Sequence, residues 1–519
     1  MAVTGEPAGV NCPMGGLLVQ TGIDSDGDGL LDPTEVGSTQ YLCDGEDGTN
    51  GTDGTNGTDG QDGTNGQDGT NGQDGTNGQD GTNGQDGTNG QDATCFDAPA
   101  LSVASIDVTP GPYFVGIAYQ VAIDVTYPGS RPLAIDLIGA GAEITHGVSP
   151  GEFAVVPAVT GPISLLAIVT DGCQVVTGTV SLPNVRAIPR LAARGLIQSS
   201  PGKSGSNELF RIGRPRAVGN WLFFSHDQLF NGGNVHLDIW DLSVPAAPLW
   251  LSTYGGSATY SQDSLWNGNG VSVSSDGTLA LVLADFGSAL VDTRNKQSPA
   301  FVEKIPYERG AHCAVFQDNE TIFVGHFGMP STYPSYSLFE AASHSVTPFV
   351  LGVDNYFRSA QMVGSHLYLV NSEFNGGLWV FDASNPSTTP VFYDAADNFV
   401  KDSALAGTTL FLSGWVGLSL YDVSAPQAPS FIKSLAVPGE GVAFWDGFLL
   451  IAGNDGAFKV VNVESPPDAA LVASVPKDQL GIGASESLAS ITVLGDTVEL
   501  GTKENLDPYA WRLRIFEIE

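Results

Sequence analysis

Glycine occupies every third position from residue 45 to residue 90, and this repeat constrains the chain more than any other feature. The run settles into Gly-Thr-Asn-Gly-Gln-Asp and has no apolar side chain up to Asp92, so it cannot build a core. Strict period-three glycine suits a polyproline-II assembly, because only a residue without Cβ fits at the axis where three such chains meet. In that conformation, at ~3.1 Å per residue, residues 45–92 would extend over roughly 150 Å. We therefore expect a stalk or a tether.

This run resembles the collagen-like repeats of bacterial surface and phage fibre proteins, which implies a homotrimer or a fibre held together through residues 45–92. It departs from them in having no proline, whereas collagen-like composition usually includes at least ~15%. It also carries ten carboxylates and no lysine or arginine, so bundled copies need salt or divalent cations to screen their repulsion. Two interpretations stay open: an ordered trimeric or otherwise bundled rod, and a flexible acidic linker.

Charge and hydropathy limit the partners of the chain. Its 519 residues include 57 acidic and 20 basic side chains, for a net charge of −37. This balance argues against nucleic acids and anionic membrane surfaces as partners and favours cations. No stretch reaches the ~18 consecutive apolar residues of a membrane-spanning helix, so no membrane span is predicted. An acidic, charge-poor chain rich in Thr, Asn and Gly is typical of secreted bacterial proteins, and we expect an extracellular location at the cell surface.

Residues 1–44 contain an acidic loop with the spacing D-x-D-x-D-G-x5-E, which is that of an EF-hand-like calcium site. Alternate carboxylates converge on one hard cation, and the glycine at the sixth position permits the sharp turn. The predicted Ca²⁺ ligands are Asp24, Asp26, Asp28, Asp32, Glu35 and the backbone carbonyl of Leu30. The segment before the loop is predicted to be a strand rather than a helix, so the loop resembles the helix-poor calcium loops of dockerin and thrombospondin repeats. The alternative is a solvated acidic turn.

Five cysteines fit an oxidising compartment if Cys12 pairs with Cys43 and Cys95 with Cys173, which leaves Cys313 free. The alternative is five buried reduced thiols. Residues 12–43 also resemble a small two-cysteine module of unassigned role that often precedes collagen-like runs in secreted proteins of Gram-negative bacteria. That resemblance supports the first disulfide and the extracellular location, and it implies no activity.

Residues 95–185 show short alternating strands broken by glycine and proline, which predicts a small β-sandwich of immunoglobulin-like class. The expected strands include Tyr119–Val125, Leu133–Ile138, Glu152–Val156 and Ile163–Val169. The segment has no tryptophan, so the buried tryptophan of true immunoglobulin domains is missing. We expect this domain to act as a spacer.

Residues 186–519 repeat a unit made of a strand, an acidic residue or Asn, a Ser-x-Pro turn and another strand. The acidic or Asn positions are 241, 292, 340, 382, 422, 462 and 517, and they lie 51, 48, 42, 40, 40 and 55 residues apart. That period is typical of propeller blades, so an all-β chain with a seven-bladed β-propeller is predicted. The last copy lacks an outer strand, which Leu191–Ile197 could supply, closing the ring and removing two sheet edges. The repeat resembles the LVIVD family of bacterial extracellular propellers, which implies no settled activity.

Chemistry-bearing motifs are few. Aligning the repeats places one set of polar residues near the rim of the propeller axis: Arg216, Asn269, His312, Ser359, Asp402, Glu440 and Ser490. Three histidines near strand ends, His226, His312 and His326, are candidate metal ligands, but core or surface hydrogen bonding is the simpler role. No nucleophile elbow, phosphate loop or zinc-protease helix occurs, so the chain is not predicted to be an enzyme. Cys313 is expected to be a buried strand thiol.

Aromatic loops offer better candidates for binding, because propeller faces commonly contact partners through such loops. The segments are 327–336 and 414–415, and packing between blades is the alternative. We predict a non-enzymatic surface protein whose stalk displays a propeller that binds a protein or a glycan. Two other functions stay open: a soluble calcium-dependent binding protein with a flexible tether, and a secreted enzyme acting at the mouth of the axial channel.

Overall fold

The computed structural model describes two stretches of the chain. The first comprises residues 2–13, 16–22, 33 and 36–43. The second runs from 100 to 519 with gaps at 199–208, 211–213, 228–234, 256–267, 285–287, 306–309, 319, 329–333, 342, 352–354, 373–376, 386–387, 395–398 and 505–509. The predicted calcium ligands and the glycine repeat lie outside the described residues.

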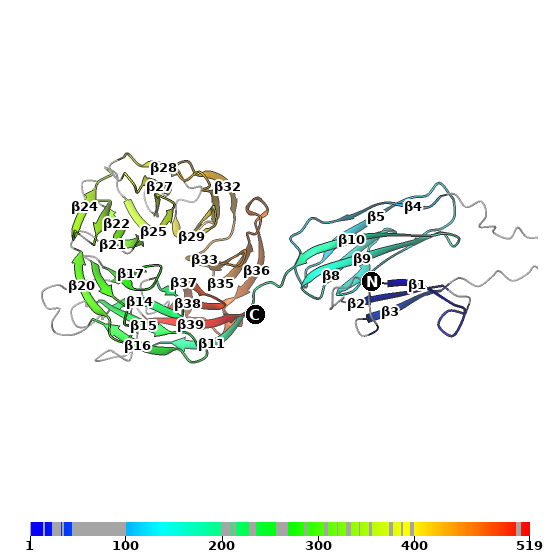
Figure 1. Cartoon of the computed structure of the whole chain (residues 1–519), viewed down its shortest axis with the longest axis horizontal. Helices are drawn as coiled ribbons and strands as arrows, with labels where there is room; N and C mark the ends of the chain where they lie inside the picture. Colours follow the sequence, from blue (N-terminus) through cyan, green and yellow to red (C-terminus); the bar gives the residue numbers. More distant parts are fainter. Residues whose placement is uncertain are drawn as a thin grey trace, which may run out of the picture. The chain divides into compact units, whose positions relative to one another are not determined.

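The described chain is all-β, as the sequence predicts, and it forms two compact units, 1–187 and 188–519 (Figure 1). Its described helices are the short 3₁₀ turns η3 (Pro466–Asp468) and η4 (Lys477–Leu480). Neither these nor any other helix in the described ranges has the length and hydropathy needed to cross a membrane.

The first unit begins with a three-stranded antiparallel sheet of order β1-β2-β3. The strands are β1 (Ala2–Glu6), β2 (Gly16–Gly22) and β3 (Val36–Cys43). Cys12, in the connection between β1 and β2, is fully buried and disulfide-bonded. Cys173, farther along the unit, is also disulfide-bonded. The predicted partners, Cys43 and Cys95, have side chains outside the described part of the structure.

Residues 100–187 form two sheets that pack face to face. One has the order β4-β5-β8-β7 and the other the order β10-β9-β6. The strands are β4 (Ser102–Val108), β5 (Tyr119–Thr126), β6 (Ala134–Gly139), β7 (Ala142–His146), β8 (Glu152–Pro157), β9 (Gly161–Thr170) and β10 (Val175–Val185). Strand β5 alternates buried and exposed residues, and its Val121 and Ile123 meet Leu165 and Ala167 of the other sheet in one core. The predicted strands are therefore present.

The second unit is built from successive groups of four antiparallel strands. The first groups are β13 (Arg216–Val218), β14 (Trp221–Asp227), β15 (Val235–Asp241) and β16 (Leu249–Tyr254); β17 (Gly268–Val273), β18 (Leu279–Ala284), β19 (Ser288–Asp292) and β20 (Ala300–Ile305); and β21 (Ala311–Phe316), β22 (Thr321–Gly328), β23 (Tyr336–Glu340) and β24 (Ser345–Phe349).

The next groups repeat this order along the chain. They are β25 (Asn355–Val363), β26 (His366–Asn371), β27 (Gly377–Asp382) and β28 (Val391–Asp394); β29 (Val400–Ala406), β30 (Thr409–Gly414), β31 (Leu418–Asp422) and β32 (Ser430–Leu435); and β33 (Gly441–Trp445), β34 (Phe448–Ala452), β35 (Ala457–Asn462) and β36 (Ala470–Pro476). The last group is β37 (Glu486–Leu494), β38 (Thr497–Glu504), β39 (Ala510–Ile518) and β11 (Leu191–Ile197).

These groups form a β-propeller. The first strand of each group contacts the first strand of the next, from β13 through β17, β21, β25, β29, β33 and β37, and β37 contacts β13 again. Figure 1 shows the resulting ring of sheets around one axis. Two pairings join neighbouring groups directly: β22 pairs with β25, and the short strand β12 (Leu209–Phe210) pairs with both β14 and β39.

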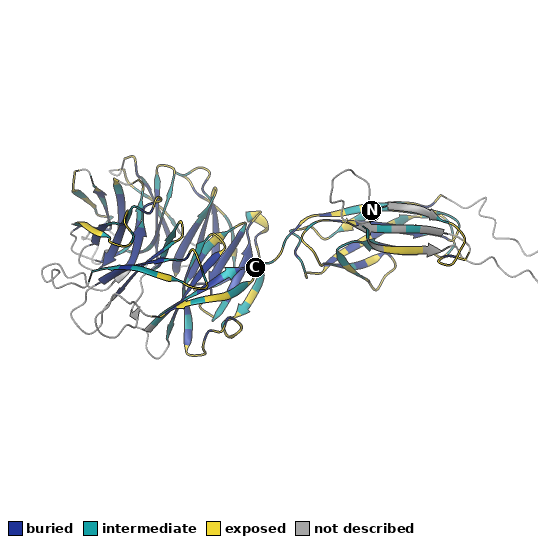
Figure 2. Ribbon diagram, turned by 60° about the horizontal axis from the view of Figure 1, so that its bottom comes forward, coloured by how far each residue is buried: buried dark blue, intermediate teal, exposed yellow. Residues whose placement is uncertain are grey.

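Both faces of each sheet are buried between its neighbours, because successive strand residues point to opposite faces. On β18, Val282 packs in the core shared with the first group, whereas Leu281 and Leu283 pack in the core shared with the third. Figure 2 shows that the central strands of the ring are buried, while the outer strands expose part of their residues. A single four-stranded sheet could not bury both of its faces by itself. The ring is therefore stabilised by the packing of each sheet against the next.

The recurring acidic position has a structural role that the sequence repeat does not reveal. The residue after it donates its backbone N–H to the turn between the first two strands of its own group. The bonds are Leu242 to Asn220, Thr293 to Thr278, Ala341 to Glu320, Ala383 to Ser365, Val423 to Thr408, Val463 to Gly447 and Ile518 to Asp496, all between 2.7 and 2.9 Å. At four positions the aspartate Oδ1 also accepts the N–H two residues later, as in Asp422 with Ser424 at 2.8 Å. The aspartate thus closes an Asx turn.

We expect Asp422→Ala to lower the melting temperature of the protein at neutral pH, and Asp422→Asn to lower it less, because asparagine keeps the accepting oxygen. The backbone N–H and the hydroxyl of Ser424 lower the pKa of Asp422. A lowered pKa means that the contribution is present above the pKa of the unfolded carboxyl and is lost as pH falls through the folded value. Thermal melts of the wild type and both variants between pH 7 and pH 3 measure how this stabilisation depends on pH. If Asp422→Ala lowered the melting temperature equally over this range, the stabilisation would not depend on ionised Asp422.

The closing strand predicted from the sequence is confirmed. β11 pairs antiparallel with β39, from Leu191 opposite Ile518 to Ile197 opposite Leu513. Two backbone bonds between Arg190 and Glu519 extend the ladder at its end. The N-terminal strand of the propeller therefore completes the sheet of its C-terminal strands, and the ring has no open seam there.

Candidate binding face of the propeller

The inner strands begin at one end of the ring, because every group repeats the same up-and-down order; we call this end the entry face. Near this end the pairing register of five inner strands shifts by one residue. The residues left unpaired at the shifts are Asn269, His312, Arg358, Lys401 and Ala489. Such bulges redirect side chains and are common next to functional sites.

An ionic cluster joins several inner strands at the entry face; we call it the axial cluster, and it comprises Arg214, Arg216, Arg358, Ser359 and Asp402. Arg214 lies just before β13, and its Nη1 donates to Asp402 Oδ1 at 2.5 Å and to the Arg358 carbonyl at 3.1 Å. Asp402 also accepts from the N–H of Ser403 at 2.9 Å and from that of Val442 at 3.2 Å. This one buried carboxylate therefore links β25, β29, β33 and the segment before β13.

Arg216 belongs to the same cluster but has no carboxylate within ion-pair distance among the described residues. Its Nη1 lies 3.5 Å from the Pro215 carbonyl, which is a long contact for a hydrogen bond. Burial lowers the pKa of Arg216, the charge of Asp402 partly opposes this, and Arg214 adds to it. Cys313 is buried nearby and free, as predicted, and burial raises its pKa to about 12, so the thiol stays protonated and is a poor nucleophile.

An aromatic platform lies beside the axial cluster, at the start of β29 and the end of β30. It consists of Phe399, Trp415 and Val416, and Trp415 is 49% exposed. The rings of Phe399 and Trp415 stack with centroids 5.7 Å apart. The Lys401 Nζ lies 4.1 Å from the Trp415 ring centroid, and the indole N–H donates to Glu440 Oε1 at 2.7 Å. These contacts fix the orientation of an exposed tryptophan, which is therefore a candidate binding residue.

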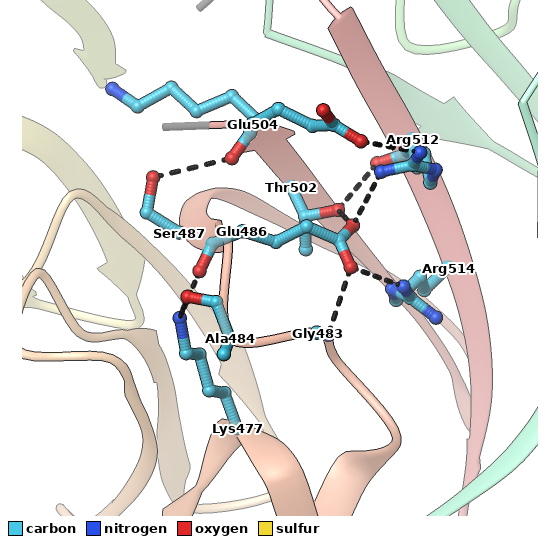
Figure 3. Close-up of polar contacts among 10 residues, drawn as sticks. Lys477, Gly483, Ala484, Glu486, Ser487, Thr502, Glu504, Arg512 and Arg514 are labelled. Atoms are coloured by element: carbon cyan, nitrogen blue, oxygen red, sulfur yellow. Dashed lines mark hydrogen bonds and ion pairs between the residues drawn. The ribbon is translucent and has the colours of Figure 1, made fainter. Parts of the chain in front are cut away.

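The arginines of β39 do not add free charge to this face, because they neutralise a buried glutamate (Figure 3). Glu486, at the start of β37, accepts from Arg514 at 2.7 Å and from Arg512 at 3.2 Å. Arg512 also binds Glu504 at 2.6 Å. Burial alone would raise the pKa of Glu486, but hydrogen bonds from Thr502 and from a backbone N–H, together with the Arg514 charge, lower it. Lys477 donates to the carbonyls of Ala484 and Glu486, which holds the turn before β37 in place.

The three predicted histidine ligands do not assemble a metal site among the described residues. His226 is buried and stacks on His236 with ring centroids 5.2 Å apart. His326 Nε2 lies 2.8 Å from the Ser337 hydroxyl, and burial lowers the pKa of this histidine to about 3. His312 instead contacts the Tyr356 ring. Within the described ranges, no group of three or more His, Cys, Asp or Glu side chains is arranged to hold a metal ion.

The structure brings together part of the predicted rim set. Arg216, Ser359 and Asp402 join the axial cluster, and Glu440 supports the platform. Ser490 instead lies on β37 opposite Gly501. The sequence alignment of the repeats missed Arg214, Arg358 and Lys401, of which the last two each lie one residue before a predicted member. Of the two predicted aromatic loops, 414–415 supplies Trp415, whereas Tyr336 of the other is buried against Phe349.

The N-terminal part of the chain matches two known families. Residues 43–95 match the family described as collagen triple helix repeat (20 copies), which confirms the predicted collagen-like run. Residues 1–43 match a domain of unknown function, DUF7151. No curated protein matches the chain.

Among solved structures, 829 chains match. One is the crystal structure of the RRP9 WD40 repeats, which is 10% identical, covers 64% of this chain and 100% of its own length, and gives a TM-score of 0.48.

Proposed function

We propose that this protein is a non-enzymatic extracellular display protein of a bacterial cell surface. A collagen-like stalk, trimeric or fibre-forming, carries the propeller as its binding domain. The match of residues 43–95 to collagen triple-helix repeats is the observation that carries this proposal. Three propellers on one stalk would bind a multivalent surface with an avidity that exceeds the affinity of one site, without any new contact.

The propeller in this proposal has seven blades of the LVIVD type. The closed succession of inner strands from β13 to β37 supports this number, and so does the hydrogen bond that recurs after each predicted acidic or Asn position. The two packed sheets of residues 100–187 serve as an immunoglobulin-like spacer between stalk and propeller.

Residues 1–44 bind Ca²⁺ in this proposal, through Asp24, Asp26, Asp28, Asp32, Glu35 and the Leu30 carbonyl. The support is the spacing of the carboxylates, which suits a hard cation with oxygen ligands. Cys12, between β1 and β2, is disulfide-bonded. Such a disulfide is typical of proteins that fold outside the cytosol.

Light scattering and circular dichroism of the full chain test the stalk. We expect a mass of three chains or more, together with a polyproline-II spectrum that melts cooperatively. A variant lacking residues 45–92 should be monomeric while keeping the β-sheet spectrum of its folded units. The same measurements with a chelator show whether calcium supports assembly. A monomeric full chain with a featureless stalk spectrum would leave only a tethered binding protein.

A further inference from the structure

The entry face concentrates positive charge in a strongly acidic protein. Arg214, Arg216, Arg358 and Lys401 all lie at the beginnings of inner strands, whereas the whole chain has a net charge of −37. Two of the four, Arg358 and Lys401, are placed there by the register shifts of β25 and β29. Several folded segments thus supply cations to one small region of the entry face.

One cation of this region, Arg216, has no carboxylate within ion-pair distance among the described residues, because the nearby carboxylates are engaged by other groups. Asp402 is engaged by Arg214 and by two backbone N–H groups. Glu440 accepts the indole N–H of Trp415. Arg216, which makes one long contact to the Pro215 carbonyl, keeps donors of its planar guanidinium unused among the described residues. A partly buried guanidinium of this kind is suited to bind a carboxylate with two parallel hydrogen bonds.

The aromatic platform adjoins this charge. Lys401 precedes Asp402 in the chain, and its ammonium lies over the Trp415 ring, so the platform and the axial cluster share the start of β29. A half-exposed indole offers an apolar surface, while neighbouring charges and amides fix the orientation of a polar ligand. Sugar rings combine an apolar face with polar edges, which matches this pairing.

We propose that the entry face binds an acidic glycan, with a uronate carboxylate at Arg216 and a sugar ring against Trp415. This proposal rests on the proposed binding role of the propeller and names its ligand class. The ligand carboxylate would form with Arg216 the ion pair that no described residue forms with it, and the aromatic platform would contact the uncharged part of the sugar. An acidic peptide would satisfy the guanidinium but would gain less from the tryptophan.

The test is calorimetric titration of the full chain with a galacturonate tetramer, in the presence of a chelator that removes calcium bridging. The matched ligand is the fully methyl-esterified tetramer, which keeps the shape and lacks the charge. We expect the acid to bind and the ester to bind at least ~10-fold more weakly. Binding of the acid should weaken as salt is raised. Equal binding of acid and ester, or no binding of either, overturns the proposal.

Protein variants locate the site. Arg216→Gln should weaken binding of the acid at least ~10-fold and Trp415→Ala should weaken it too, whereas Arg216→Lys should retain part of it. Arg294→Gln is the control, because Arg294 is exposed on the turn after β19 and binds Asp292. Thermal melts show that each variant is folded. Unchanged binding by folded Arg216→Gln, or equally tight binding of tetraglutamate, overturns the proposal, while a trimeric stalk in the same preparation leaves the display function intact.

Discussion

Replacing Glu499 by glutamine is expected to stabilise the propeller at neutral and alkaline pH. Glu499 lies in the middle of β38, is 2% exposed, and has no hydrogen-bond partner for either carboxyl oxygen among the described residues. Thr492, directly across the strand pair, donates its hydroxyl to the Pro215 carbonyl instead. Burial raises the pKa of Glu499 well above its ordinary value, and the nearby Thr492 offsets this only partly.

The direction of this change in stability follows from proton linkage. A raised pKa means that the folded state holds its proton more tightly than the unfolded state, so the unfolding free energy falls as pH rises above the pKa of the unfolded carboxyl. The loss is about 1.4 kcal/mol per pH unit until the folded carboxyl ionises. Glutamine has nearly the same shape and does not titrate. We therefore expect Glu499→Gln to match the wild type near pH 4 and to exceed it increasingly toward pH 8.

Chemical unfolding followed by tryptophan fluorescence at a series of pH values measures this difference. The eight tryptophans all lie in residues 188–519, so the signal reports on the propeller alone. Glu320→Gln serves as the control, since Glu320 is exposed and its loss should give no gain that grows with pH. A Glu499→Gln variant that is less stable than the wild type at pH 8 would show that Glu499 is ionised and paired in the folded state.

Truncating one side chain of the closing strand is expected to destabilise the whole ring. Ile197 of β11 is 1% exposed and packs in a core with Leu222, Leu513 and Ile515. Leu196, its neighbour in the same strand, is 44% exposed. Because large-to-small changes in a core lose both transfer energy and packing, Ile197→Ala should lower the unfolding free energy by about 2–4 kcal/mol.

Leu196→Ala is the matched control and should cost less than about 1 kcal/mol, because its side chain is largely in water already. Both changes shorten a branched aliphatic residue of β11, so strand propensity does not separate them. Tryptophan fluorescence in denaturant again reports on the propeller. Equal effects of the two variants would mean that β11 contributes to the ring through its backbone ladder alone.

Much of the fold follows from local pattern in the sequence. The alternation of apolar residues predicted strands such as Ile163–Val169 of the sandwich, which lies inside β9, and the chain end after 517 predicted that Leu191–Ile197 would complete the last sheet. These features are predictable because side-chain direction alternates along a strand and because an unpaired strand edge needs a partner.

The candidate site was predicted only in part. Arg216 and Asp402 lie at positions that an alignment of the repeats singles out, and Trp415 lies in a predicted aromatic loop; all three belong to the entry face. Arg358 and Lys401 were missed because each lies at a shift of register. A bulge arises from the pairing of two strands, so the sequence of one strand does not show which residue is redirected.

Glycine at every third residue, the period of the strand groups and the spacing of the acidic loop are properties of the sequence by itself, because each depends on neighbours within a few residues. The sequence therefore determined the all-β composition, the collagen-like run and the closing strand. Only the tertiary structure decided that Glu499 is buried, that Asp402 links four segments, and that no described carboxylate lies within ion-pair distance of Arg216. Burial and charge balance depend on residues from distant parts of the chain, which meet only when the ring closes.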